Sequence, residues 1–244
     1  GPISMTPLSG ISFIVIARNE AFGIEKCLAA LSAMPLRDCQ IVCVDSNSSD
    51  DTRSIMERYA RACPELVEVH ACVGDTNAAV ARNAGMAHAR KEIIQFVDGD
   101  VELELAFLAA AAEIIRSGRA AMVCGSLREI RYAEGFRETT EELEARLPVR
   151  EEREVYFSGG IFMVRADIAR RAGAWDERLV VNEDFDYTLR ISRHARCLAI
   201  PVSMGTHHTL AANYTVRAWQ HLRRGYPLNY GYVLRRHCVT NFPG

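Results

Sequence analysis

Residues 92–101 read EIIQFVDGDV, an apolar run that ends in two carboxylates separated by one residue. Because β-branched and aromatic residues are frequent in this short run, it predicts a buried strand over 92–98. Gly99 permits a tight turn after the strand, so that Asp98 and Asp100 project together from its carboxyl end. Oxygen ligands in this arrangement suit Mg²⁺ or Mn²⁺ held together with substrate phosphates.

Three strand–helix units come before this motif. We expect strands over 11–17, 40–45 and 66–71, and helices over 20–33, 51–62 and 77–90. Such alternation is typical of βαβ units around a mostly parallel central sheet flanked by helices. Farther along, the alternation is looser, with expected strands over 121–130, 155–165 and 197–202 and expected helices over 103–116, 167–172, 183–194 and 214–224. No linker or repeat interrupts the chain, so the sequence predicts one α/β domain over residues 5–244.

The composition is that of an ordinary globular domain, with 49% apolar and 25% charged residues among 244. It excludes a disordered or collagen-like chain, and the length favours one large α/β unit. No run reaches the roughly 18 apolar residues of a membrane span, and no signal peptide is recognisable, so we expect a soluble cytoplasmic protein. The eight cysteines form no CxxC pair. We expect them to be buried small hydrophobes and not zinc ligands or a disulfide framework.

Charge is distributed unevenly along the chain, although the net formal charge is only −2. All 31 acidic residues lie at or before Asp186, and residues 187–244 contain eight arginines. A basic tail of this kind could clamp a diphosphate, rest on an anionic membrane surface or bind nucleic acid, or it could be a solvated face. We favour a diphosphate contact through Arg223 and Arg224 over peripheral contact at the inner face of a membrane, and we expect no nucleic-acid partner.

Two common phosphate-binding motifs are missing from the sequence. A dinucleotide site would need GxGxxG directly after the first strand, and a P-loop would need GxxxxGK[ST]. Their absence argues against hydride transfer and Walker-type phosphoryl transfer. The FVDGDV motif by itself also fits haloacid-dehalogenase phosphatases, but in that family the motif normally follows the first strand, whereas three units precede it here.

Six motifs in order resemble those of one enzyme family. They are FIVIARNEA (13–21), IVCVDSNSSDDT (41–52), VARNAGMAHA (80–89), FVDGDV (96–101), SGGIFMVRADIARRAGAWDERL (158–179) and NEDFDYTLR (182–190). Over about residues 9–210, the chain resembles the family 2 glycosyltransferases of the GT-A fold. The resemblance implies a single Rossmann-like GT-A domain, with a nucleotide-binding half over 9–100, an acceptor and catalytic half over 101–210, and a basic aromatic tail over 211–244.

The resemblance also implies which residues hold the donor. The implied nucleotide contacts are Ala17, Asn19, Glu20, Asp45, Arg82, Asp98 and Gly99. Asp45 would accept from a uracil ring N–H, which favours a UDP-sugar, although turn and helix-terminal carboxylates are also common as purely structural groups. Asp100 would ligate the divalent metal, Mn²⁺ or Mg²⁺, and His207 or His208 of GTHHT would add a nitrogen ligand. Adjacent residues on an extended segment point opposite ways, so we expect at most one of these histidines to reach the metal.

The motif NEDFDYTLR contains the implied catalytic residues. Asp184 matches the base of the family, which takes the proton of the acceptor hydroxyl, and Glu183 beside it would orient the base or touch the acceptor. The alternative is that these acids only complement the dipole at the start of a helix. We expect Asp186 to face away from Asp184 and to pair with Arg190 four residues on. On the acceptor side the resemblance implies Gly159, Gly160 and Trp175.

Together these implications predict an inverting glycosyltransferase. It would move a sugar from a nucleotide-sugar, most simply a UDP-sugar, to an acceptor hydroxyl by metal-assisted single displacement. The acceptor would be a glycan, a lipid-linked molecule or a small molecule. Two alternatives stay open at this point: a haloacid-dehalogenase-like phosphatase using Asp98 and Asp100, and a protein that binds nucleotide-sugars without catalysis.

Overall fold

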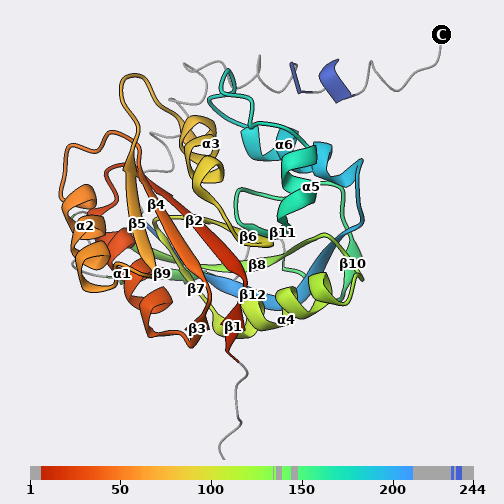
Figure 1. Ribbon diagram of the computed structural model, residues 1–244, viewed down its shortest axis with the longest axis horizontal. Helices are drawn as coiled ribbons and strands as arrows, with labels where there is room; N and C mark the ends of the chain where they lie inside the picture. Colours follow the sequence, from red (N-terminus) through yellow and green to blue (C-terminus); the bar gives the residue numbers. More distant parts are fainter. Residues whose placement is uncertain are drawn as a thin grey trace, which may run out of the picture.

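Four parallel strands form the first half of the ten-stranded sheet that the described residues contain (Figure 1). The computed structural model describes residues 7–133, 135, 139–143, 148–210, 232–233 and 235–237. In sheet order the four strands are β6 (Ile93–Asp98), β2 (Ile11–Ala17), β4 (Gln40–Asp45) and β5 (Val67–Ala71). The connecting helices are α1 (Ala21–Ala33), α2 (Thr52–Ala62) and α3 (Ala78–His88). Each expected element of this half is confirmed, with bounds that differ by at most two residues.

The second half of the sheet is mixed in direction. The strand of this half that adjoins β6 is β11 (Phe162–Arg165), which runs antiparallel to both β6 and β8 (Met122–Tyr132). Strand β12 (Cys197–Leu210) runs parallel to β8. The shorter elements are β7 (Val101–Leu103), β9 (Thr139–Leu143), β10 (Arg153–Glu154), α4 (Leu105–Arg116), α5 (Ala166–Arg171) and α6 (Glu183–Ser192), and β1 (Leu8–Ser9) pairs separately with β3 (Leu36–Arg37). The α/β class with a central sheet flanked by helices is therefore confirmed, and its parallel order is confined mainly to the first half.

Two strands differ from the expectation by more than two residues. The strand expected over 155–165 is confined to β11, because residues 155–161 form a loop in which Gly160 approaches the side chain of Arg82. The strand expected over 197–202 continues to Leu210, because β12 pairs with both β7 and β8 along this extension. The same pairing explains why α4 begins two residues later than expected. The helix expected over 214–224 lies outside the described residues.

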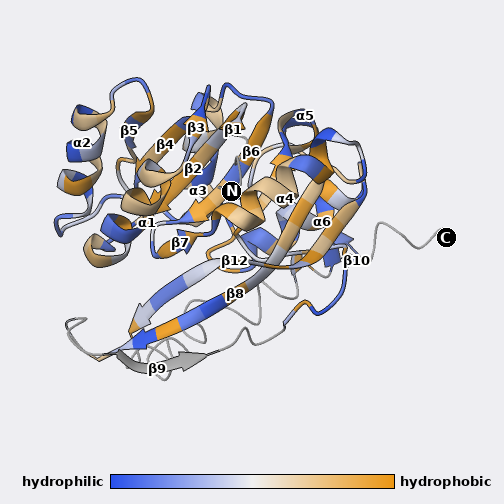
Figure 2. Cartoon of the chain, turned by 90° about the horizontal axis from the view of Figure 1, so that it is seen from below, coloured by the Kyte–Doolittle hydropathy of each residue, from blue (hydrophilic) through white to orange (hydrophobic). Residues whose placement is uncertain are grey.

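Apolar residues fill the strands and the inner sides of the helices, whereas the far ends of β8 and β12 beside β9 are largely hydrophilic (Figure 2). Both β2 and β4 are buried along their whole length, as expected for parallel strands covered on both faces. Seven cysteines of the described residues are free thiols, and five of them are buried. Among the described helices, none combines the length and the apolar composition needed to cross a bilayer.

Helix α3 lies unusually close to strand β2. A Cβ atom added at Gly85 would lie 2.3 Å from Cγ2 of Ile14 and 3.4 Å from Cγ2 of Val44. Only a residue without a side chain permits this approach. The close packing matters for the site because Arg82, on the same helix and three residues earlier, is thereby held near the carboxyl ends of the strands.

Gly85→Ala should therefore destabilise the protein, by about 1–3 kcal/mol, because the added methyl group overpacks the interface between α3 and β2. In an exposed helix the same change would stabilise by roughly 0.5–1 kcal/mol. Chemical denaturation of the variant shows whether the free energy of unfolding falls or rises. If the contact with Ile14 is the cause, Gly85→Ala should cost less in an Ile14→Ala background than in the native protein.

Candidate active site

A cavity of about 570 Å³ opens at the carboxyl ends of the parallel strands, where ligands bind in open α/β sheets. Both halves of the chain contribute to its wall. The sequence-predicted residues that line it are Ala17, Glu20, Arg82, Asp98, Gly99, Asp100, Gly160, Glu183, Asp184 and His207. Ala17 and His207, which are 190 positions apart in the chain, meet here because the two halves of the sheet are joined at strand β6.

The turn after β6 is packed tightly against the first strand and the first helix. Gly99 donates its backbone N–H to the Ile16 carbonyl at 2.8 Å. A Cβ atom on Gly99 would lie 2.6 Å from Cβ of Ala17, and one on Gly23 of α1 would lie 2.6 Å from Cα of Asp100. These close approaches fix the turn, so that the side chains of Asp98 and Asp100 both line the cavity.

Asp100 and His207 form a hydrogen-bonded pair in the cavity wall. Nε2 of His207 lies 2.9 Å from Oδ2 of Asp100, because the pairing of β12 with β7 places His207 opposite Val101. Burial alone would lower the pKa of His207, but the hydrogen bond and charge of Asp100 raise it overall. One carboxylate oxygen and one imidazole nitrogen form a donor set that suits Mn²⁺ better than Mg²⁺, which binds mainly oxygen. These two residues therefore fit the cation that the resemblance implies.

His208 faces the opposite side of the strand. Its Nδ1 lies 2.8 Å from the Tyr132 hydroxyl, and its Nε2 lies 3.2 Å from Oε2 of Glu102. Burial lowers the pKa of this imidazole. Of the two histidines, His207 is the one that approaches Asp100. His208, which was also named as a candidate metal ligand, points away from it, and this part of the prediction is corrected.

Arg82 lies at the centre of the site, buried between two carboxylates. Its Nη2 is 2.8 Å from Oδ1 of Asp98, and its Nη1 is 2.8 Å from Oε1 of Glu183. Burial alone would lower the pKa of the guanidinium, but the charges of both carboxylates raise it overall. A guanidinium of this kind stays charged and holds one geometry, so Arg82 joins α3, β6 and α6 at one point.

Trp175 is a support for Arg82 and not an acceptor contact. The indole is 1% exposed and stacks on Tyr187 with ring centroids 4.0 Å apart. The guanidinium carbon of Arg82 lies 4.7 Å from the indole ring centroid, within the range of a cation–π contact. The acceptor-side role that the resemblance implied for Trp175 is therefore corrected, because a buried indole in the core cannot reach a substrate.

Glu183 and Asp184 begin helix α6 on the far wall of the cavity. Burial raises the pKa of both carboxyl groups. Asp184 also accepts a hydrogen bond from the Phe185 backbone N–H at 2.7 Å, and Gly159 lies next to its carboxylate. A second cavity of about 410 Å³, lined by both Gly159 and Gly160, adjoins the first, so Asp184 is near a space in which an acceptor could bind.

The pairing expected within α6 is confirmed. Nη2 of Arg190 lies 2.8 Å from Oδ2 of Asp186, whose side chain is fully buried. His237 also contacts Asp186, with its Nε2 2.9 Å from Oδ1. Asp186 is therefore a buried structural residue that pairs with Arg190 and His237, and it does not line the cavity.

Two residues that were predicted to contact the nucleotide form hydrogen bonds with the loop after β4. Asp45 is 2% exposed, lies outside the cavity wall, and accepts from the Ser48 backbone N–H at 3.2 Å. Oδ1 of Asn19 accepts from the Ser49 backbone N–H at 2.8 Å. The carboxylate of Asp45 is thus turned to its own loop, and its contact with a uracil ring stays a prediction. Arg223 and Arg224 lie outside the described residues.

Sequence reasoning missed three residues of the cavity wall near this loop. Oγ of Ser46 and Oγ1 of Thr76 lie 2.7 Å apart, and Asn77 caps α3 by accepting from the Val80 backbone N–H at 3.0 Å. The capping asparagine could have been found, since asparagine is favoured at the residue before a helix. The contact of Ser46 with Thr76 joins two loops 30 residues apart and leaves no signal in a local pattern.

The family of the chain follows from comparison with known proteins. The model described as "Glycosyl transferase family 2" matches residues 12–175. The chain belongs to glycosyl transferase family 2. The matched residues include the turn at Asp98 and Asp100 as well as Arg82, whereas Asp184 and His207 lie beyond the match.

Curated relatives are all named as glycosyltransferases. Glycosyltransferase AglE of Haloferax volcanii is 27% identical over 187 residues, which cover 74% of this chain and 60% of AglE. Poly(ribitol-phosphate) beta-glucosyltransferase of Bacillus spizizenii is 32% identical over 92 residues, which cover 37% of this chain and 14% of that protein. The chain thus spans less than two thirds of the length of AglE and a small part of the glucosyltransferase.

Solved structures share the fold. Staphylococcus aureus TarS 1-349 matches with a TM-score of 0.66 and 19% identity, covering 95% of this chain and 65% of that one. The mannosyltransferase PcManGT from Pyrobaculum calidifontis, in complex with GDP-Man and Mn²⁺, matches with a TM-score of 0.67 and 20% identity, covering 96% and 68%. At these identities the likeness concerns the fold, and it confirms the GT-A architecture expected from the motifs.

Arg82→Met should destabilise the protein by about 3 kcal/mol, because it leaves Glu183 buried without its cationic partner. The exposed Arg61→Met is the matched control and should change the free energy of unfolding by less than about 0.5 kcal/mol. Adding Glu183→Gln to Arg82→Met should restore part of the loss, since no unpaired buried charge remains at that position. Chemical denaturation of the four proteins measures these differences, and equal losses for the two arginine variants would contradict the assigned role.

Proposed function

We propose that this protein transfers a sugar from a nucleotide-sugar to an acceptor hydroxyl, with inversion, by a single displacement. The observation that supports this most directly is the arrangement of one cavity. The turn with Asp98 and Asp100 lines one wall, and Asp184 lines another. In this proposal the donor diphosphate would lie beside the first wall and the carboxylate base would lie on the second, as an in-line displacement requires.

In this proposal Asp184 takes the proton of the acceptor hydroxyl while the new glycosidic bond forms. A base with a pKa raised above the ordinary aspartate range is better matched to this task than an exposed carboxylate. Glu183, which also lines the cavity, holds Arg82, and Arg82 holds Asp98; a contact of Glu183 with the acceptor stays a prediction. Asp100 and His207 would hold a divalent cation, which supplies positive charge to the leaving diphosphate when it is bound.

We propose a UDP-sugar as the donor. The support comes from relatives of the same fold, since TarS structures contain UDP-GlcNAc or UDP, although PcManGT binds GDP-Man. A competition experiment identifies the nucleobase of the donor: UDP should displace a labelled donor at lower concentration than GDP. If GDP competes better than UDP, the donor assignment fails while the transfer mechanism stands. The diphosphate contact by Arg223 and Arg224 and a peripheral membrane contact both remain predictions.

Asp184→Asn should lower the rate of sugar transfer by about 10² to 10⁴, because an amide keeps the shape but cannot accept the proton. Donor affinity should change little. In the native protein, transfer should be lost as the pH falls through the pKa of Asp184, which burial raises above the ordinary aspartate value.

Donor turnover in the presence of Mn²⁺, followed as UDP release, measures these effects. Glu65→Gln replaces an exposed carboxylate far from the cavity and is the matched control. An unchanged transfer rate in Asp184→Asn would show that another residue is the catalytic base. Binding without any turnover by the native protein would favour the non-catalytic alternative.

Asp100→Ala should abolish the dependence of UDP binding on Mn²⁺ and leave the fold intact, because a carboxylate at the end of a strand contributes little to the core. The comparison is with Asp75→Ala, which removes an exposed carboxylate from a loop. Calorimetric titration of UDP with and without Mn²⁺ gives both affinities. A metal-dependent affinity equal to that of the native protein would show that Asp100 is not a ligand.

A further inference from the structure

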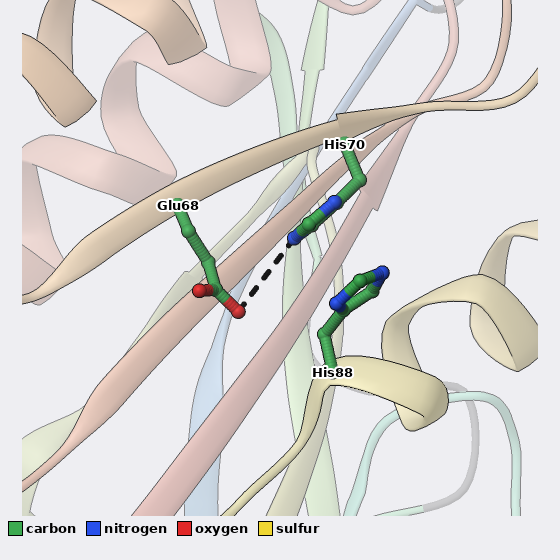
Figure 3. Close-up of side chains that lie close together, drawn as sticks. All are labelled: Glu68, His70 and His88. Atoms are coloured by element: carbon green, nitrogen blue, oxygen red, sulfur yellow. Dashed lines mark ion pairs between the residues drawn. The ribbon is translucent and has the colours of Figure 1, made fainter.

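Three side chains of types that can ligate a metal lie close together on β5 and α3 (Figure 3). Glu68 and His70 project from the same face of β5, since they are two residues apart, and His88 ends α3. Along α3, His88 follows Arg82 by six residues, or about 9 Å of helix. None of the three lines the cavity. We propose that Glu68, His70 and His88 bind a borderline divalent cation of the Zn²⁺ type.

The separations suit one ion. One ligand atom from each residue can be chosen so that all three lie within 4.8 Å of one another, and Nε2 of His70 lies 3.6 Å from Oε1 of Glu68. A tetrahedral ion with ligand distances of about 2.0–2.2 Å holds its ligand atoms about 3.4 Å apart. The cluster therefore needs only a small contraction.

The two imidazoles are stacked, with ring centroids 3.5 Å apart and 13° between the planes. The lone pair of an imidazole nitrogen lies in the ring plane, so two nearly parallel rings hold their lone pairs in parallel planes, and one ring must tilt before both nitrogens can meet the ion. His88 can tilt, because it lies at the end of its helix and the outer torsion of histidine is broad.

Two further observations favour an ion over a chance cluster. Nε2 of His70 is buried and makes no hydrogen bond to the part of the chain that the structure describes, although buried polar atoms are normally satisfied. In addition, Nε2 of the buried Gln40 donates to Oε1 of Glu68 at 2.6 Å. Residues that ligate metals are typically oriented by such outer hydrogen bonds.

Arg90 contacts both oxygens of Glu68. Its Nη1 lies 3.2 Å from Oε2 and 3.4 Å from Oε1, and its Nη2 lies 3.3 Å from Oε2. An ion bound at Oε1 would therefore replace only the longest of these contacts and leave the ion pair at Oε2. Two nitrogens and one oxygen suit Zn²⁺, Co²⁺, Ni²⁺ or Cu²⁺ and not Mg²⁺, which prefers oxygen. The ion would join the edge strand β5 to α3, the helix that positions Arg82.

The test uses tag-free protein in an Asp100→Asn background, so that the ligand pair in the cavity does not contribute. Titration with Co²⁺ should produce the visible absorption of a tetrahedral nitrogen–oxygen site, and Zn²⁺ in excess should remove it. His88→Gln should weaken Co²⁺ binding at least about tenfold. His194→Gln replaces an exposed histidine just after α6 and should leave binding unchanged.

A thermal measurement gives a second readout that does not depend on catalysis. Zn²⁺ should raise the melting temperature in a concentration-dependent manner, and His88→Gln should remove that rise, whereas Mn²⁺ should produce little. The absence of a Co²⁺ band overturns the proposal. So does a band that persists in both His88→Gln and Glu68→Gln, because the ion would then be bound elsewhere.

Discussion

The pairing of one buried arginine with two carboxylates connects the two halves of this fold. Arg82 contacts Asp98 at the end of β6 and Glu183 at the start of α6. Taking three charged groups out of water is costly unless their geometry is closely matched, so the pairing favours one relative position of the two halves. The absence of a side chain at Gly160 is needed for it, because a Cβ atom there would lie 2.2 Å from Nη2 of Arg82.

The first half of the fold could be predicted from the sequence because its signals are local. The apolar runs of β2 and β4 are buried throughout, and the helices between the strands begin and end within two residues of the expected positions. The second half depends on contacts distant in the chain. Residues 155–161 leave the sheet to approach α3, and β12 is extended by pairing with β7, about 100 residues earlier. No periodicity within either segment reports such a partner.

For the candidate site, too, the sequence predicted some features and not others. The rule that ligands bind at the carboxyl ends of parallel strands was enough to place Asp98 and Asp100 in the cavity. It could not show where a side chain at such an end points. The carboxylate of Asp45 turns to the backbone of Ser48, and Trp175 is buried in the core. Both orientations follow from loop and core packing, which a motif does not describe.

The charges of the cavity wall give a physical reason why the proposed reaction would use a cation. Five carboxylates and two arginines line the cavity, and Arg82 is already engaged by Asp98 and Glu183. A nucleoside diphosphate entering this space would meet a net negative wall, and the repulsion would grow as the sugar departs and the leaving group gains charge. A divalent ion at Asp100 and His207 would reverse the sign of the field where the diphosphate must lie, while leaving Asp184 free to act as a base on the other wall.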